Sequence, residues 1–314
     1  MPNEPTAYSA FFVYFAPERI DFMNRHYWQP GLFLTPAIFL SLLFSYWPLL
    51  QDLWLSFHSW NMVSPTMKFV GLDNYRQLMS GDELFKILAN TLFYIILLVI
   101  INFLLPYLLS FVMAHCIHHF KFFYRSILFI PSTLSLAVAS IIFLWIFNPL
   151  AGPISLLLSS IGLTSPSWFK EPGFVIAAIS FIIGWKIFGY NLLVLLAAMV
   201  DVPKDLIEAA KLENASNWHI FRYIVVPMTS PTAIYVLIIT IVFGLQYVLV
   251  PLNMLTQGGP NQSSTNLVYI VYQYGFVFFQ TGKAAALAIL TMIVYAGFLV
   301  IKSKALNKKV HYEN

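Results

Sequence analysis

One lysine of this sequence lies in the middle of a long apolar stretch. Lys186 sits about halfway along residues 173–199, with Tyr190 and Asn191 about one helical turn further on. If this stretch crosses a membrane, the charge costs about 3 kcal/mol to insert, which makes Lys186 a candidate functional residue. Tyrosine hydroxyls and asparagine amides are groups that bind sugar hydroxyls. Two interpretations stay open: Lys186 faces a cavity and favours an anionic solute, or it bonds a backbone carbonyl and is structural.

Other polar side chains lie in the remaining apolar stretches. Gln246 and Asn253 extend the candidate solute pathway, which then comprises Lys186, Tyr190, Asn191, Gln246 and Asn253. Weaker candidates are Asn102, Ser132, Thr133, Ser135 and Ser140. Residues of these types commonly make hydrogen bonds between helices, so a structural role is the alternative for each.

The sequence gives no sign of catalytic or metal chemistry. His115, His118 and His119 have a helical spacing that could gather a metal, but Cys116 is the only thiol and no carboxylate stands near them. No G-x-x-x-x-G-K-[ST] loop occurs, nor G-x-S-x-G or H-E-x-x-H. We therefore expect no catalytic residue, no metal and no cofactor in this chain.

The composition places the chain in a membrane. Of its 314 residues 59% are hydrophobic and 10% charged, and the mean hydropathy is +0.76. Soluble domains have about a quarter of their residues charged, so lipid must cover part of this surface. The lone Cys116 also excludes a disulfide framework. These features predict an all-α membrane protein.

The apolar stretches predict six membrane-spanning helices, because a spanning helix needs about 20 apolar residues. The six lie approximately at 31–57, 88–115, 122–147, 173–199, 230–254 and 284–301. Four prolines within them are expected to be kinks and not helix ends, since a bundle can satisfy the freed carbonyls: Pro36, Pro48, Pro106 and Pro131.

Lysine and arginine are more frequent in alternate gaps, and the richer side of a membrane protein is normally the cytoplasm. The richer set is the N-terminal segment, the second and fourth gaps, and the C-terminal segment, so both termini are predicted to be cytoplasmic. We expect a cytoplasmic arm at 1–30, a membrane domain at 31–303 and a cytoplasmic tail at 304–314. The charges scattered through the arm do not fit a cleaved signal peptide.

The fourth gap predicts two short helices in place of a simple loop. Residues 201–227 read DVPKDLIEAAKLENASNWHIFRYIVVP. Pro203 suits a first helical turn, Asn214 suits the left-handed residue that ends a helix, and Ser216 can cap the next helix. The apolar positions of this helix pair could bury against the bundle or against a partner. A helix lying on the membrane surface is the plain alternative.

The residues Glu208-Ala209-Ala210, then Asn214, then IVVP at 224–227 resemble the EAA loop of permeases from ABC importers. That family has glycine where this chain has Asn214, and asparagine tolerates the same backbone region. Stretches similar to the carbohydrate-uptake branch follow in order over about 30–302: FVGLDNY at 69–75, FIP at 129–131, WIFNP at 145–149, LLA at 195–197 and TQGGP at 256–260.

The resemblance implies a role for each motif residue. The loop would be the coupling helix that docks on an ATPase subunit, with Glu208 as the charged contact and Ala209 and Ala210 allowing close approach. Asn214 and Pro227 belong to the same motif. Because the sequence contains no nucleotide-binding loop, ATP and Mg would be held by the partner subunits.

The resemblance also implies the partners and the setting. They are a second permease subunit, two ATPase subunits and an extracytoplasmic solute-binding protein, in a bacterial inner or plasma membrane. The solute would be a sugar, an oligosaccharide or a polyol, including its phosphate. An ion-coupled secondary transporter of a small polar solute is the alternative, but such a carrier has no need for the helix pair at 203–223.

Overall fold

The computed structural model describes residues 28–115 and 121–306. The chain divides into two compact units, residues 1–51 and 52–314. The expected arm and tail lie largely outside the described residues, as do His118 and His119. In the first unit α2 (Trp28–Ser41) leads through a π-helical turn, η1 (Leu42–Tyr46), into α3 (Trp47–Leu55), which runs on into the second unit. Pro36 lies inside α2, as predicted.

The second unit is almost entirely helical. A short antiparallel pair, β1 (His58–Ser59) and β2 (Lys68–Phe69), precedes the helices. The first helices are α4 (Asp73–Met79), α5 (Asp82–Val99), η2 (Ile100–Leu104), α6 (Leu105–His115), α7 (Lys121–Thr133), α8 (Leu136–Ile146) and α9 (Pro153–Ser160). They are followed by α10 (Phe174–Val200), α11 (Lys204–Leu212), α12 (Asn217–Ile220), η3 (Phe221–Val225), α13 (Val226–Tyr247), α14 (Leu249–Leu255), α15 (Leu267–Tyr272), η4 (Gln273–Val277) and α16 (Thr281–Leu306).

Within the described part of the chain, four helices are long and apolar enough to cross a membrane. They are Gly31–Leu55, Asp82–His115, Phe174–Val200 and Asn217–Leu255. The pair α7 and α8 makes a fifth if it is counted as one broken span, and Thr281–Gly297 is a shorter apolar helix. The all-α membrane class is confirmed, whereas the number of six spans stays a prediction.

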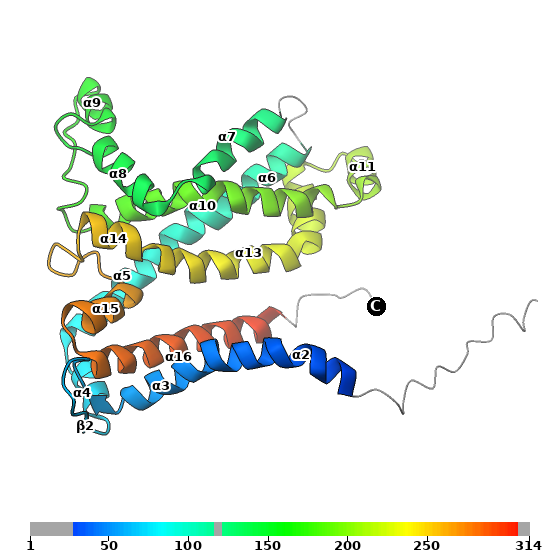
Figure 1. Cartoon of the computed structure of the whole chain (residues 1–314). Coiled ribbons are helices and arrows are strands. Elements are labelled where there is room, and N and C mark those ends of the chain that lie inside the picture. Colours follow the sequence, from blue (N-terminus) through cyan, green and yellow to red (C-terminus); the bar gives the residue numbers. More distant parts are fainter. Residues whose placement is uncertain (1–27, 116–120, 307–314) are drawn as a thin grey trace, which may run out of the picture. The chain divides into compact units, whose positions relative to one another are not determined.

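The predicted span at 122–147 is formed by two helices and is not one kinked helix. The helix breaks between Thr133 and Leu136, and the two pieces meet at 103°. Pro131 lies inside α7, so the proline does not end that helix. Ser135 has an extended backbone, and its hydroxyl accepts a hydrogen bond from the Val138 amide at 3.2 Å, which caps α8. Figure 1 shows α7 and α8 diverging from this point.

Helix α10 is the centre of the second unit. It packs against α5, α6, α7, α8 and α13, and side chains such as Ile179, Ile183 and Leu195 are completely buried. A Cβ atom at Gly189 would lie 2.0 Å from the carbonyl oxygen of Leu128, so glycine is required where α7 crosses α10. This close crossing places Lys186 and Tyr190 of α10 directly beside α7.

Candidate functional site

The predicted inner helix pair is present and ends as the sequence indicated. Helix α11 stops at a Schellman motif: Asn214 is left-handed at φ 58°, its amide donates to the Lys211 carbonyl at 3.0 Å, and the Ala215 amide donates to the Ala210 carbonyl at 3.0 Å. The Ser216 hydroxyl accepts from the His219 amide at 3.2 Å and caps α12. One detail differs, because Pro203 is the residue before α11 and not part of its first turn.

The helix pair buries only part of its apolar residues against the bundle. Ile207, Ile220, Phe221 and Val225 pack against α6 and the end of α10. Leu206 and Ala209 are exposed, and Leu212 and Trp218 are 85% and 62% exposed. Glu208 and Pro227 are also exposed, whereas Ala210 is half-buried. We call Leu206, Glu208, Ala209, Leu212 and Trp218 the coupling surface. An exposed apolar surface of this kind is typical of a site that contacts a protein partner or a membrane.

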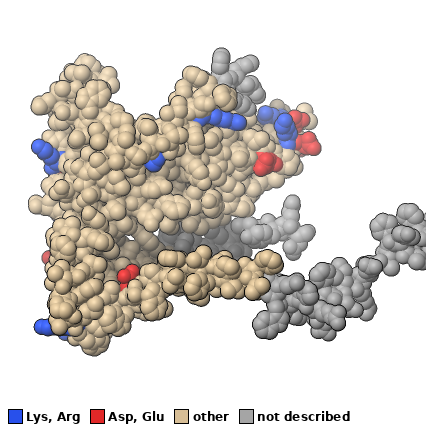
Figure 2. All heavy atoms as spheres, in the orientation of Figure 1, with Lys and Arg blue, Asp and Glu red and all other residues tan. Residues whose placement is uncertain are grey.

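Charged side chains accompany this surface. Figure 2 shows acidic and basic residues gathered over α11. In Figure 1 this helix lies at one end of α10, and α14 lies at the other end. Lys204, Asp205, Lys211 and Glu213 flank the coupling surface and are all exposed. The arrangement provides an apolar patch with a charged rim, which is the usual composition of a protein interface.

A cavity of about 320 Å³ lies between α7, α10 and α13. Its lining includes three of the predicted pathway residues, Lys186, Tyr190 and Asn191. The others are Phe129, Ser132, Ile187, Tyr235, Ile239, Phe243 and Tyr247. Four of the aromatic side chains are exposed in this chain: Tyr190, Tyr235, Phe243 and Tyr247. The cavity is therefore open on one side of the helices, with an aromatic wall.

The ammonium group of Lys186 is engaged with the backbone. It donates to the carbonyl of Ser132 at 2.9 Å and to the carbonyl of Leu134, and the Ser132 hydroxyl donates to the carbonyl of Lys186 at 2.8 Å. The last carbonyls of a helix have no intrahelical partner, so Lys186 satisfies those at the broken end of α7. The side chain thus lines the cavity while it holds the break between α7 and α8.

Asn191 joins three spans. It is fully buried, and its Nδ2 atom donates to the Asn102 carbonyl at 2.6 Å and to the Thr240 hydroxyl at 2.9 Å. These partners lie in η2 and α13, so the asparagine ties α10 to the helices on either side. Its amide nitrogen is therefore occupied by protein partners.

Gln246 and Asn253 lie apart from this cavity. Neither lines it, both are exposed, and the Oδ1 atom of Asn253 accepts from the Tyr269 hydroxyl at 3.4 Å. The cavity instead has an aromatic wall, which the types of the polar residues do not indicate. Tyr235, Ile239, Phe243 and Tyr247 recur every four residues along the fifth predicted span. That spacing was the available signal, because it places all four side chains on one helix face.

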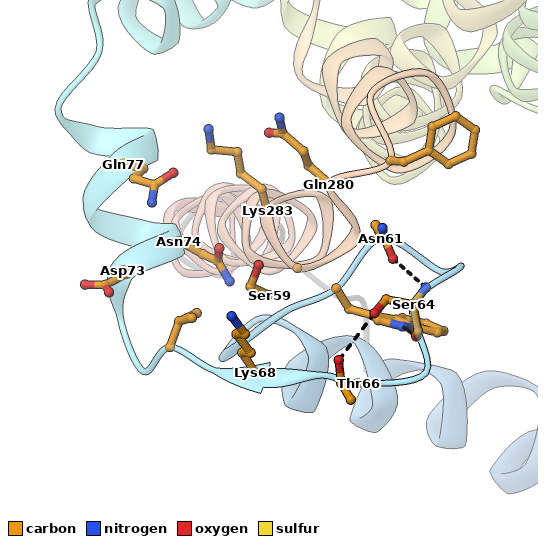
Figure 3. Close-up of a pocket in the computed structure, with 14 residues that line it drawn as sticks. Ser59, Asn61, Ser64, Thr66, Lys68, Asp73, Asn74, Gln77, Gln280 and Lys283 are labelled. Carbon is orange, nitrogen blue, oxygen red and sulfur yellow. Dashed lines mark hydrogen bonds between the residues drawn. The ribbon is translucent and has the colours of Figure 1, made fainter.

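The end of the unit away from α11 contains a polar recess of about 650 Å³. It is formed by β1, β2, α4 and the start of α16, and it includes Lys68, Gln77, Gln280 and Lys283. Figure 3 shows Gln77, Asn74 and Ser59 around the space beside α16, with the Asp73 carboxylate directed away. The ammonium group of Lys283 also lies 5.2 Å from the centre of the Tyr274 ring.

Hydrogen bonds fix the walls of this recess. The Nδ2 atom of Asn74 donates to the carbonyls of Ser56 and His58 at 2.8 and 3.0 Å, and the Thr281 amide donates to the Trp60 carbonyl at 3.0 Å. A Cβ atom at Gly282 would lie 1.8 Å from the His58 carbonyl oxygen, so this contact needs glycine. The recess is preformed by the fold.

The TQGGP turn and its continuation are buried more deeply than an outer contact loop would be. Ser263, Ser264, Thr265 and Asn266 are buried, and the Nδ2 atom of Asn90 donates to the carbonyls of Gln262 and Thr265 at 2.8 and 3.1 Å. This segment is held against the start of α5. Its main role in the described structure is to close that end of the bundle.

The described residues contain no cluster of three or more His, Cys, Asp or Glu side chains that could hold a metal. His115 is described, but His118 and His119 are not. The expectation that the chain has no metal site stays a prediction.

Residues 107–310 match the model of the family described as "Binding-protein-dependent transport system inner membrane component", and the chain belongs to this family. It is accordingly a permease subunit of an ABC importer, embedded in the membrane.

Particular relatives agree with this assignment. The chain is 28% identical over 291 residues to the sn-glycerol-3-phosphate transport system permease protein UgpA of Pectobacterium atrosepticum, covering 92% of this chain and 97% of the relative. It is also 28% identical over 290 residues to the probable ABC transporter permease protein YurN of Bacillus subtilis, covering 90% and 97%.

A solved structure shares the fold. It is a chain of a bacterial ABC transporter involved in the import of the acidic polysaccharide alginate, with a TM-score of 0.76 and 21% identity. The match covers 90% of this chain and 96% of that one. At this level of identity the likeness establishes the fold alone.

Proposed function

We propose that this chain forms half of the translocation pathway for a sugar or a related polyhydroxylated solute, and that separate subunits supply the ATP hydrolysis. The observation that best supports this proposal is that this chain contains both the coupling surface and an open aromatic cavity. Aromatic faces pack against the C–H faces of sugars, and the tyrosine hydroxyls can bond to the sugar hydroxyls. The relatives named for glycerol phosphate and for alginate both act on polyhydroxylated, anionic compounds.

The proposal includes a second permease subunit. The cavity is open on one side in this chain, so a second subunit facing it would complete the pathway. The solute then meets Tyr190 of α10 and the aromatic residues of α13 from this half. Lys186 keeps the α7 end in place beside the solute, which makes it a positioning residue in this proposal.

We place the coupling surface in the cytoplasm, where two ATPase subunits with their ATP and Mg would dock. Glu208 and Ala209 then lie at that interface, with Ala210, Asn214 and Pro227 shaping the helix pair behind it. Both termini would be cytoplasmic, with an arm at 1–30 and a tail at 304–314. The polar recess would face outward in a bacterial inner or plasma membrane.

The recess is the proposed contact for the solute-binding protein. It lies at the end of the unit opposite to α11, and its walls are fixed by hydrogen bonds. Two of its side chains are lysines, so an acidic side chain of the binding protein fits the charge of the recess.

The aromatic wall gives the experiment that tests the proposed solute class. Replacing Phe243 and Tyr247 together by alanine is expected to lower the uptake rate of sugar about thirtyfold, because two aromatic contacts of about 1 kcal/mol each are lost. Uptake is measured in vesicles that contain the full importer, with the binding protein held constant. Phe93→Ala removes an exposed aromatic residue of α5 outside the cavity and should leave uptake unchanged. Wild-type uptake by the double variant would contradict the proposal.

A further inference from the structure

A second pocket lies beside α7 and α10, nearer to α11 than the cavity. It has a volume of about 290 Å³ and is lined by Arg125, Leu193, Leu196, Ala197, Val200 and Asp201. On α7, Arg125 precedes Phe129 by four residues, and on α10, Leu193 and Ala197 follow Tyr190 by three and seven residues. These helical spacings place the pocket on the same face of α7 and α10 as the cavity.

Arg125 is the unusual residue in this pocket. Its Nε atom is buried and has no hydrogen-bond partner among the residues that the structure describes. Four of the five other lining residues are hydrocarbon side chains. Burying an N–H group without an acceptor costs free energy of folding, and this cost is larger when the group is charged. An acceptor from outside the described chain would remove that cost.

We propose that this pocket binds an anionic oxygen group, a phosphate or a carboxylate, with the guanidinium of Arg125 as its anchor. A guanidinium presents a planar set of donors that matches two oxygens of such a group. The hydrocarbon walls suit the apolar part of the same molecule. Nothing assigned to the chain so far uses Arg125.

Two sources could supply this group. A membrane lipid would bring its headgroup phosphate at the depth where α10 ends and its acyl chain along Leu193 and Leu196, and basic pockets between helices bind such headgroups. A free anion, such as the phosphate of a transported polyol, would reach the same atoms from the cavity. The inference goes beyond the proposed function, because the site would exist even if the importer carried a neutral sugar.

Substituting Asp201 tests the direction in which anion binding at Arg125 should change. Its carboxylate lines the same pocket, so it repels an anion bound at Arg125. If Arg125 binds an external anion, Asp201→Asn strengthens that binding. If Arg125 instead serves only to pair with Asp201, the wild-type pocket holds no anion and Arg125→Gln leaves the amount of bound anion unchanged.

The test uses the full importer complex and two probes. In the lipid arm, phosphatidylglycerol retained by the complex in phosphatidylcholine nanodiscs is counted by native mass spectrometry. In the free-anion arm, binding of inorganic phosphate is measured by equilibrium dialysis in a phosphate-free detergent. The variants are Arg125→Gln, Arg125→Lys and Asp201→Asn. The matched control is Arg76→Gln, because Arg76 is exposed on α4 and lines none of the cavity, the second pocket and the polar recess.

The proposal expects Arg125→Gln to lower bound anion at least fivefold in one arm, Arg125→Lys to lower it less, and Asp201→Asn to raise it. A loss confined to the lipid arm identifies a headgroup, and a loss confined to dialysis identifies a free anion. Equal binding by wild type, Arg125→Gln and Asp201→Asn in both arms would overturn it. Should Arg125→Gln fail to fold, Arg125→Lys and Asp201→Asn decide, since they are expected to change binding in opposite directions.

Discussion

Replacing Glu208 by lysine is expected to abolish ATP-driven uptake while the chain still folds and inserts. Glu208 is exposed on α11, and substitutions at such positions usually change the free energy of unfolding by less than about 0.5 kcal/mol. Reversing a charge inside an interface costs several kcal/mol of association free energy. The loss should therefore appear in docking to the ATPase subunits and not in folding.

The measurement compares co-purification of the ATPase subunits and solute-stimulated ATP hydrolysis for wild type and Glu208→Lys. Glu213→Lys is the matched control, because Glu213 is an exposed acid at the end of the same helix and lies outside the coupling surface. We expect Glu213→Lys to keep most of the activity. If Glu208→Lys assembled with its ATPase and imported at the normal rate, Glu208 would have no place in the interface.

Reversing the charges of Lys68 and Lys283 together is expected to weaken binding of the solute-binding protein at least tenfold. Both lysines line the polar recess, and an acidic partner side chain that they attract would be repelled by two glutamates. A tenfold change corresponds to about 1.4 kcal/mol, which is modest for two charge reversals. The effect should also shrink as salt is added, because salt screens exposed charges.

Binding of the solute-loaded binding protein to the membrane complex measures this effect directly, and the stimulation of ATP hydrolysis should fall with it. Lys170→Glu is the matched control, since Lys170 is exposed in the segment between α9 and α10 and does not line the recess. Wild-type affinity of the Lys68→Glu, Lys283→Glu double variant at low salt would exclude the recess as the docking site.

The inner helix pair was largely predictable because its signals are local. Asn214 and Ser216 determine where one helix ends and the next begins, and each acts on backbone groups within a few residues. Which residues the pair buries was not predictable in the same way. Ile207 is buried while Leu206 and Leu212 are exposed, because burial depends on how α11 is rotated against α6 and α10.

The break between α7 and α8 shows a second limit. Pro131 suggested only a kink in one span, yet the helix continues past it and breaks at residues 134–135. The carbonyls freed there are satisfied by Lys186, more than 50 positions along the chain. A sequence pattern cannot show a hydrogen-bond partner so distant in the chain. The sequence therefore indicated that the charge of Lys186 is costly in a membrane, but not which carbonyls it bonds.

The positions of the candidate pathway residues show how far the sequence could group them. Lys186, Tyr190 and Asn191 share one turn of α10, so they were found together and the structure places them at one cavity. Gln246 and Asn253 were chosen by residue type alone, and the structure places them away from it. The spacing of the aromatic residues in α13 indicates which face of that helix lines the cavity.

We expect this chain to move its solute only with ATPase subunits on one side and a binding protein on the other. The direct measurement is sugar uptake by sealed vesicles containing the chain with its second permease and ATPase subunits. We predict accumulation only when ATP is inside and solute-loaded binding protein is outside, and none with a proton or sodium gradient alone. Gradient-driven uptake by vesicles that contain this chain alone would contradict the account and support an ion-coupled secondary transporter.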